Sequence, residues 1–467
     1  MNEKPTYELD KILSSVEPEH FNRYRNEEDT DSQMSVSEFF NRYIGSYGLQ
    51  LSNVIRQSDI PANYAYGILN GNRTKKLVMI DKANHHMFQP LFYQVACGRI
   101  EPSNISFPFR KIFQRSKNIQ FRMTEVKQII PSENKIITED HVFHYDKLVI
   151  ATGCKTNFFG NQKMENLAFG MKNTQEAISI RNHVLLTFEK LIIEKSRSDD
   201  GNWNIVIVGS GPTGVELAGA FAEMKREILP RDYPRMNFDD LEIILVSSTE
   251  KPLAVMSEES QEKSEQYLKD LGVRFISNDR VTDYDGDRVY LSSGNIIPSN
   301  NVIWAAGVTG NIIEGLTENS IKNNRYIVDR YNKIVGFDDI YAIGDIAYME
   351  TPKYPNGHPQ VANVAINQGK NLAKNFLKKS ENEWQPYEYD DKGSMATIGK
   401  HRAVVDLPKF KFQGIFAWYF WMFLHLMLIL SVRNKLAIFF NWMWSYINRD
   451  SSLRLIIIPN KKNKTEQ

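Results

Sequence analysis

Residues 205–219 read IVIVGSGPTGVELAG and predict the architecture of the region around them. Its four leading β-branched residues predict a fully buried strand, and the segment after the glycines predicts a helix. Two further apolar runs follow, each after a helical segment, so that 204–275 alternates strand and helix. This order predicts a doubly wound α/β unit with a parallel sheet.

The turn inside this stretch has the pattern G-x-G-x-x-G, and each glycine has a physical role. Gly209 permits the tight turn, Gly211 lets a pyrophosphate approach the backbone, and Gly214 lets the helix pack on the strand. The helix begins at Pro212 and Thr213, where free N–H groups favour phosphate. We expect these residues to bind a dinucleotide; a purely structural turn is the alternative.

The strand that follows the turn, at 241–246, ends in Ser247 and Ser248. The motif ordinarily has an acidic residue there, which binds the adenosine ribose. We expect Ser247 to take that place. Without a carboxylate a 2′-phosphate is not repelled, and Lys251 lies close by in the sequence. The sequence therefore predicts measurable use of NADPH beside NADH.

Length and composition limit the number of domains and the classes of protein to which the sequence can belong. At roughly 150 residues per domain, 467 residues predict about three domains. Lys and Arg number 57 and Asp and Glu 56, a balance that disfavours nucleic acid as a partner. Two cysteines exclude a disulfide framework and a four-thiolate metal site. The acidic N-terminus lacks the apolar core of a signal peptide, so a cytosol-facing protein is expected.

From residue 77 to 459 the sequence resembles the type II NADH:quinone oxidoreductases. Six blocks in the family's order carry the resemblance, beside the glycine motif: IDKANHH at 80–86, FQPLFYQVA at 88–96, YDKLVIATG at 145–153, WAAG at 304–307, YAIGDIA at 341–347 and PQVANVAINQG at 359–369.

The resemblance implies a single-subunit, non-proton-pumping flavoprotein with two disulfide-reductase-like Rossmann domains. It implies a quinone substrate, an FAD cofactor and the nucleotide NADH, and leaves a homodimer open. The domains expected are a helical segment at 1–74, an FAD domain at 77–157 and 320–395, an NAD(P)H domain at 158–319 and a membrane-anchoring region at 396–467.

The resemblance also implies site residues. Those expected near the cofactors are Asp81, Gln89, Pro90, Leu91, Thr152, Gly153, Ala306, Gly307, Gly344 and Asp345. Those expected near the quinone are Ala362, Asn363, Ala365, Ile366, Asn367 and Gln368. Glu216 is expected to act in quinone binding or proton transfer, and Lys400 to line the same cavity. The alternatives are a glutamate that only satisfies a helix dipole and a surface lysine.

One departure from the family concerns the flavin. An FAD-binding fold of this type begins with a strand and a glycine turn roughly 30 residues before the acidic residue, here Asp81. No such motif stands in that window, so the FAD domain is expected to lack its first βα unit. A flavin-free pseudo-enzyme is therefore a second hypothesis. A smaller departure is that Asn363 and Asn367 stand where the family usually has glutamines.

In place of the missing unit, residues 36–73 resemble a phage-repressor-like helix-turn-helix domain. The segments 51–58 and 61–71 match its two helices, the second being the recognition helix. A three-helix packing module without a DNA partner is the alternative. A DNA-binding regulator that senses redox state is a third hypothesis for the whole chain. His85 and His86 are adjacent on an extended segment and point in opposite directions, so no metal site is expected.

The C-terminal region is dense in aromatic and aliphatic residues. Residues 414–432 carry no formal charge and would extend about 28 Å as a helix, close to the thickness of a bilayer core. His425 and Ser431 interrupt the run, and four tryptophans suit a membrane interface. We expect two helices lying in one leaflet; a spanning helix and a buried core are the alternatives. The resemblance implies the cytoplasmic face of a bacterial inner membrane.

Overall fold

Four parallel strands form the sheet that the glycine-rich stretch predicts, in the order β12-β11-β10-β16. The computed structural model describes residues 76–194, 202–448 and 453–457. Ile205 lies opposite Ile243 on one side and Asn301 on the other. The strands are β10 (Ile205–Val208), β11 (Ile243–Val246), β12 (Val273–Ile276) and β16 (Asn301–Trp304).

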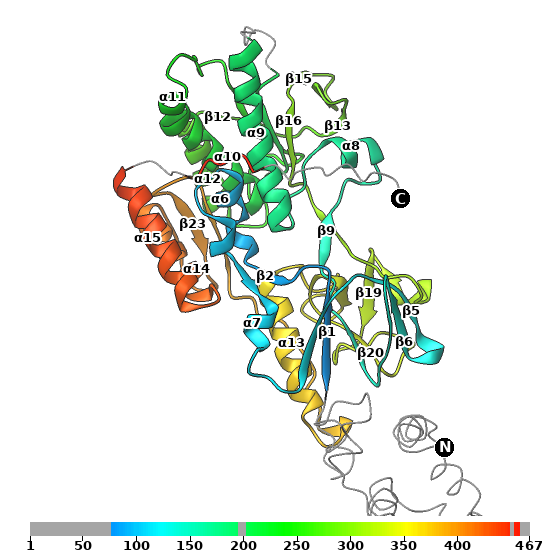
Figure 1. Ribbon diagram of the computed structural model, residues 1–467. Coiled ribbons are helices and arrows are strands. Elements are labelled where there is room, and N and C mark those ends of the chain that lie inside the picture. The colour runs from blue at the N-terminus through cyan, green and yellow to red at the C-terminus, as the bar shows by residue number, and fades with distance from the viewer. Residues whose placement is uncertain (1–75, 195–201, 449–452, 458–467) are drawn as a thin grey trace, which may run out of the picture. The chain divides into compact units, whose positions relative to one another are not determined.

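Both faces of this sheet are covered, which explains why β10 is apolar at every position. Ile205 and Ile207 face the helices on one side, in the largest core cluster. Val206 and Val208 belong to a second core on the opposite face. The helices are α9 (Thr174–Glu194), α10 (Pro212–Glu223) with its π-helical continuation η5 (Met224–Ile228), α11 (Leu229–Asp232) and α12 (Glu258–Asp270) (Figure 1). An antiparallel sheet covers the second core: β13 (Val281–Tyr284), β14 (Arg288–Leu291) and β15 (Ile296–Pro298).

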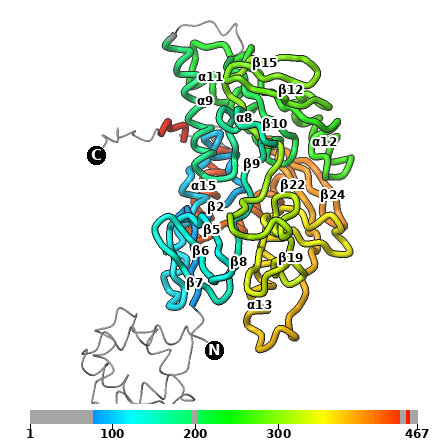
Figure 2. The backbone as a smooth tube through the Cα atoms, turned by 90° about the vertical axis from the view of Figure 1, so that its right-hand side faces the viewer, coloured from blue at the N-terminus to red at the C-terminus, as the bar shows by residue number. Residues whose placement is uncertain are grey.

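The chain enters and leaves this region through two paired strands, β9 (Cys154–Thr156) and β17 (Val308–Gly310), which run antiparallel (Figure 2). Outside them lies a second strand-rich region. Its strands are β5 (Val126–Ile130), β6 (Lys135–Thr138), β7 (Val142–His144), β8 (Leu148–Ile150), β18 (Ile321–Lys322), β19 (Arg325–Val328), β20 (Ile340–Ala342) and β21 (Ala347–Met349). Helix α13 (Ala362–Phe376) follows.

The second region contains only a fragment of a parallel sheet. β8 pairs with β20 in parallel and, among the residues that the structure describes, with no second strand. This is the arrangement expected for an FAD domain without its opening strand, because that strand is usually central in the sheet.

A separate compact unit contains β1 (Leu77–Asp81, up to Ile80) and most of β4 (Ile119–Met123), and these two strands pair with each other. The helix-turn-helix prediction for 36–73 lies outside the described residues.

The apolar C-terminal run forms two helices. They are α14 (Ile415–Leu428) and α15 (Val432–Asn448), which follow the small sheet of β22 (Ser394–Thr397), β23 (Ala403–Asp406) and β24 (Lys411–Gln413). Ser431, with a φ of 74°, interrupts the helical backbone between them. Within the described part of the chain, no helix is both long and apolar enough to cross a membrane. The two-helix expectation therefore agrees with the structure, whereas a single helix over 414–432 does not form.

Both ends of this helix pair are attached to the rest of the chain. Before α14, the Gly414 N–H donates to the Ala403 carbonyl. After α15, the guanidinium of Arg454 pairs with Asp232 on α11, with one Nη2–Oδ1 distance of 2.9 Å. The Asn182 amide on α9 donates to the Ile457 carbonyl at 2.6 Å.

The other short elements connect these layers. They are β2 (His85–Met87), η1 (Gln89–Leu91), α6 (Phe92–Ala96), η2 (Pro102–Asn104), β3 (Ser106–Pro108), α7 (Phe109–Phe113), η3 (Pro131–Glu133), α8 (Gln162–Leu167), η6 (Glu318–Ser320), η7 (Gly344–Ile346) and η8 (Glu381–Glu383).

Candidate functional site

The glycine turn between β10 and α10 has the geometry of a dinucleotide cradle. Gly209 has a φ of +104°, and a Cβ there would meet the backbone of Ala306 at 2.7 Å. A Cβ on Gly214 would lie 1.8 Å from the Gly209 carbonyl oxygen. A Cβ on Gly211 would meet nothing within 4 Å. The first and third glycines are thus required for the fold, whereas the second leaves open space beside the helix N-terminus for a pyrophosphate.

Residues around the turn complete this cradle. Pro212 and Thr213 occupy the first turn of α10, where the helix has no side-chain cap. Ala306 lies against Gly209, and Gly307 follows it with a φ of +114°. These residues fit a bound nucleotide, because the unpaired N–H groups of the helix start face the space left by Gly211.

Ser247 lies at the end of β11 as predicted, but its hydroxyl is already engaged. It is buried, 2.6 Å from the Ser210 hydroxyl and 2.8 Å from that of Thr249. The Lys251 ammonium lies 2.9 Å from Glu262 and 3.5 Å from Glu258. The lysine that the sequence offered to a 2′-phosphate is therefore neutralised by two carboxylates.

Several residues expected near the flavin meet where β8 and β20 end. The Thr152 hydroxyl donates to the Asn311 carbonyl at 2.7 Å, and Gly153 beside it has a φ of +65°. Asp345 accepts a hydrogen bond from the Cys154 thiol at 3.0 Å. Burial, foremost, raises the pKa of that thiol to about 12, so it remains a donor. These contacts orient the Asp345 carboxylate.

Gln368 on α13 reaches the same place. Its side-chain oxygen accepts the Gly344 N–H at 2.7 Å. Its amide nitrogen is buried and has no hydrogen-bond partner among the residues that the structure describes. A buried donor without a partner is costly, and an acceptor from a bound cofactor would satisfy it. The donor set at this point therefore fits a polar group such as the ribityl chain of FAD.

The other residues of the quinone segment lie on several faces of α13. Ala365 is beside Gly344, whose added Cβ would come within 3.1 Å of the alanine methyl. Asn367 is half-buried, and three residues are exposed: Ala362, Asn363 and Ile366.

The remaining flavin-site predictions lie elsewhere in the fold. The Asp81 carboxylate accepts the Ala83 N–H at 2.7 Å, and its backbone ends β1. Gln89 is exposed and Pro90 half-buried in η1, whereas Leu91 is fully buried in the main core. Leu91 therefore contributes packing at this position.

Glu216 is a buried acid on α10. Its Oε1 accepts the Thr397 backbone N–H at 3.4 Å, across from β22. Burial raises the pKa of its carboxyl to about 8, although the Thr397 hydrogen bond opposes the shift. Glu216 therefore holds a proton at neutral pH, which a glutamate that only satisfied a helix dipole would not do.

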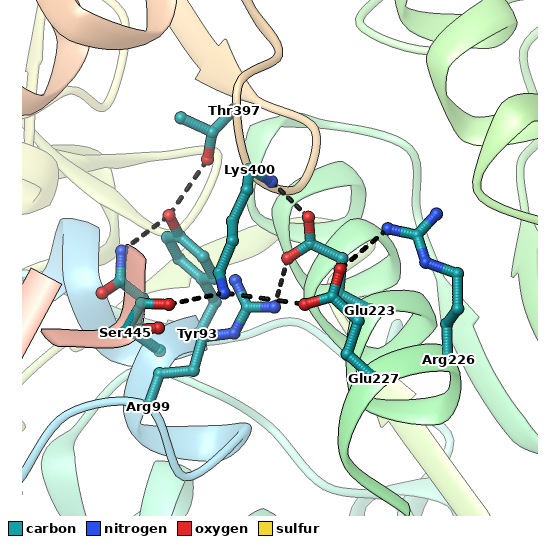
Figure 3. A network of polar contacts seen from close by, with 9 residues as sticks. Tyr93, Arg99, Glu223, Arg226, Glu227, Thr397, Lys400 and Ser445 are labelled. Atoms are coloured by element: carbon teal, nitrogen blue, oxygen red, sulfur yellow. Dashed lines mark hydrogen bonds and ion pairs between the residues drawn. The ribbon is translucent and has the colours of Figure 1, made fainter. Parts of the chain in front are cut away.

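Lys400 lies in the loop 398–402 between β22 and β23, beside a cluster of charges on α10 and η5 (Figure 3). Its ammonium lies 3.2 Å from the Ser445 carbonyl and 3.6 Å from Glu227. Its backbone N–H donates to Glu223. Burial, with the positive charge of Arg99 added, lowers the pKa of Lys400. The lysine is thus neither a free surface residue nor bonded to Glu216.

Two further residues in this cluster escaped the sequence analysis. Arg99 pairs with Glu223 in the interior, where the side chains are 12% and 2% exposed. Glu223 follows Glu216 by two helical turns. Nothing in the local sequence marks Arg99, because its partner is 124 residues away.

The exposed faces of α14 and α15 are apolar. Large side chains there reach exposures of 78% at Phe416 and 73% at Val432. Other exposed members of this surface are Tyr419, Phe423, Leu428, Leu436, Phe440 and Trp444. Such a contiguous patch marks an interaction surface rather than an ordinary solvated face.

Comparison with known proteins agrees with this geometry. Residues 61–369 match the family model for pyridine nucleotide-disulphide oxidoreductases, and 392–450 match the NDH2 C-terminal domain. The type II NADH:quinone oxidoreductase NdhA of Mycobacterium tuberculosis is 31% identical over 410 residues, covering 82% of this chain and 86% of the relative. The Staphylococcus aureus type II enzyme is 26% identical, covering 70% and 82%.

Solved structures show the same fold. NDH2 of Plasmodium falciparum, determined with NADH, superposes with a TM-score of 0.76 at 19% identity, covering 82% of this chain and 95% of that one. The sulfide:quinone oxidoreductase of Aquifex aeolicus superposes with a TM-score of 0.61 at 19% identity, covering 82% and 90%. With both family models matched and NdhA aligned over most of its length, the chain belongs to the pyridine nucleotide-disulphide oxidoreductase family and, within it, to the type II NADH:quinone oxidoreductases.

Proposed function

We propose that this chain is a flavin-dependent NADH:quinone oxidoreductase. The observation that carries the proposal is the open cradle at Gly211 on the same helix as a buried, protonated Glu216. The relatives that match over most of the chain are named for this activity. They favour it over the DNA-binding regulator, for which the described residues offer no argument.

In this proposal the protein holds both cofactors by its backbone and by a few polar groups. The start of α10 binds the pyrophosphate of NADH beside Gly211. Asp345 accepts hydrogen bonds from hydroxyls of the flavin side chain, and the free Gln368 amide donates one. Bound FAD supplies hydride uptake from NADH and electron transfer to the quinone.

Glu216 supplies a proton in this scheme. Reduction of a quinone to a quinol takes up two electrons and two protons, and the hydride of NADH carries both electrons and one of these protons. Since the pKa of Glu216 is raised to about 8, its carboxyl is protonated at neutral pH and gives one proton to a quinone oxygen. It is then reprotonated from solvent. We propose that the quinone contacts the exposed face of α13, which carries Ala362, Asn363 and Ile366.

Two measurements on purified full-length protein test the proposal. The visible spectrum is expected to show bound oxidised flavin, and NADH oxidation is expected to depend on an added short-chain quinone. A colourless protein that folds and binds NADH would instead be the flavin-free pseudo-enzyme. Flavin without quinone-dependent turnover would overturn the quinone substrate but not the cofactor.

We propose further that α14 and α15 lie on the cytoplasmic face of a membrane without crossing it. The support is their exposed apolar patch, which suits the interfacial region of a bilayer. Flotation with lipid vesicles followed by carbonate extraction tests this. The protein should float with the vesicles and be released by carbonate, and a protein that stays in solution without detergent or lipid contradicts the proposal.

For the nucleotide we propose use of NADPH beside NADH, since no carboxylate at the end of β11 repels a 2′-phosphate. The pairing of Lys251 with Glu262 limits this use. The substitution Glu262→Gln is expected to raise kcat/KM for NADPH relative to NADH. An unchanged ratio would show that Lys251 does not approach the nucleotide.

A further inference from the structure

Four hydrogen bonds connect the C-terminal helix α15 to the buried glutamate on α10. The Trp442 indole N–H donates to Gln94 Oε1 at 2.8 Å, and Gln94 Nε2 donates to the Tyr93 hydroxyl at 2.9 Å. The Tyr93 hydroxyl lies 3.0 Å from the Thr397 hydroxyl. The Thr397 backbone N–H donates to Glu216 at 3.4 Å. Figure 3 shows the middle of this chain, where Tyr93 points toward Thr397.

The first two bonds of this hydrogen-bond chain have a defined direction. An indole N–H donates and never accepts, so the amide oxygen of Gln94 faces Trp442 and its NH₂ group faces Tyr93. In the next bond, between the Tyr93 and Thr397 hydroxyls, either oxygen can donate. The orientation of the Gln94 amide, and the position at which Tyr93 accepts from it, are therefore set by Trp442 on α15.

Packing holds the members of the chain in place. Tyr93 and Gln94 are 6% and 7% exposed, and Thr397 is 2% exposed. The Tyr93 ring meets Trp421 of α14 edge-on, with centroids 6.4 Å apart. Trp421 in turn lies 6.2 Å from Trp442. A displacement of either C-terminal helix would therefore move the Tyr93 hydroxyl.

The last bond of this hydrogen-bond chain is the longest of the four. At 3.4 Å it lies near the outer limit of a hydrogen bond. It is also the contact that opposes the effect of burial on Glu216. A small shift of Thr397 away from α10 therefore removes the stabilisation of the charged carboxylate and favours the protonated acid.

We propose that Tyr93 and Gln94 are positioning residues for Glu216, which transmit the placement of α15 through Thr397 to the N–H that Glu216 accepts. The inference rests on the proposed function in assigning Glu216 the proton transfer. It adds that the proton affinity of this acid depends on how the C-terminal helices are seated.

The other charged groups around α10 do not take over the role of this hydrogen-bond chain in setting the proton affinity of Glu216. The strands β10 and β11 beneath the helix carry no ionisable side chain. All charged side chains of α12, and Arg274 on β12, are exposed. The nearby ions are five members of the Arg99 cluster, which are paired among themselves: Arg99, Glu223, Arg226, Glu227 and Lys400. Tyr93 is the ionisable group whose charge state is coupled to Glu216.

The test is the pH dependence of quinone reduction by the full-length, flavin-loaded protein in lipid vesicles. In Tyr93→Phe the ring remains and the hydroxyl is lost. The alkaline limb of the kcat profile is expected to move upward by up to about half a pH unit, because a contact at 3.4 Å is weaker than a full backbone hydrogen bond of roughly 1 kcal/mol. Thr397→Val and Trp442→Phe are expected to shift it in the same direction.

Matched variants separate positioning from packing. Tyr284→Phe removes an equally buried hydroxyl on β13, whose partner is the Gly286 carbonyl at 2.9 Å, and should leave the limb in place. Thr397→Ser keeps the hydroxyl that Thr397→Val removes. Its alkaline limb should therefore lie at the pH of the unsubstituted protein and not at that of Thr397→Val. A Tyr93→Phe profile that superposes on that of Tyr284→Phe overturns the proposal.

A second readout does not require turnover. The infrared band of the protonated Glu216 carboxyl, assigned by its loss in Glu216→Gln, is titrated in each variant. Its midpoint should rise in Tyr93→Phe, even if the unsubstituted protein reduces no quinone. In that case the proposed function fails and the positioning inference stands. If instead the midpoint does not move while turnover is normal, the positioning inference fails and the proposed function stands.

Discussion

A Cβ atom added to Gly219 would lie 2.7 Å from the backbone nitrogen of Gly399. Helix α10 and the loop 398–402 thus touch backbone to backbone, with no side chain between them. This contact is what brings Thr397 and Lys400 to the side of α10 that carries Glu216 and Glu223.

Gly219→Ala is expected to push this loop away from α10. The nearest atoms are backbone and cannot rotate aside, so overpacking should cost about 1–3 kcal/mol of unfolding free energy. This loss outweighs the gain of up to about 1 kcal/mol that alanine brings to a helix. Denaturant unfolding measures it. Gly369→Ala on α13, whose Cβ would meet only Ile343 at 3.6 Å, is the control and should be neutral or stabilising.

The raised pKa of Glu216 predicts a stability that depends on pH. The folded protein keeps the proton up to a pKa of about 8, whereas the unfolded chain releases it near 4.5. This contribution is complete below pH 4.5 and is lost as the pH rises to 8, at about 1.4 kcal/mol per pH unit. Urea unfolding of Glu216→Gln should lack that part of the slope. Equal slopes in the two proteins would mean that Glu216 is already charged.

Glu223→Gln should be among the more destabilising changes in this region. It leaves the guanidinium of Arg99 in the interior without its countercharge, which typically costs about 3–5 kcal/mol. The double variant Arg99→Met with Glu223→Gln should recover part of the loss. Lys322→Met breaks the exposed pair with Glu350, and it should change the unfolding free energy far less than Glu223→Gln does. Additive losses in the double variant would argue against a coupled pair.

Gly211→Ala should separate binding from folding. Its Cβ meets nothing in the protein, so the melting temperature should stay within about 1 °C of the original. The methyl group occupies the space through which a pyrophosphate approaches the backbone, and the Kd for NADH should rise at least about tenfold. Calorimetry gives both quantities. Unchanged affinity would place the nucleotide away from this turn.

The parts that sequence reasoning predicted are those set by local geometry. Gly209 and Gly214 have their roles fixed by neighbours within a few residues, and the strand 205–208 by its own apolar pattern. The Arg99 cluster and the Tyr93–Thr397 contact could not be found in this way, because their partners are 124 and 304 residues apart. These contacts exist only after α6, α10 and β22 have packed.

Ser247 and Lys400 illustrate a different limit. Ser247 directly follows β11, where the motif places it, and Lys400 lies beside η5, but the polar atoms of both are already used by neighbours. Ser210 and Thr249 engage the serine hydroxyl, and Glu227 the lysine ammonium. The sequence shows which polar group stands at a position. Whether that group is free to bind a ligand depends on the side chains that pack against it in the folded protein.

The attachment of α14 and α15 at both ends restricts how the molecule rests on any surface. The pair cannot swing outward unless the Gly414–Ala403 bond or the Arg454–Asp232 ion pair breaks. Tilting the helices therefore tilts the parallel sheet with them. If these helices rest on a lipid layer, as proposed, their two attachments orient the nucleotide domain relative to that layer.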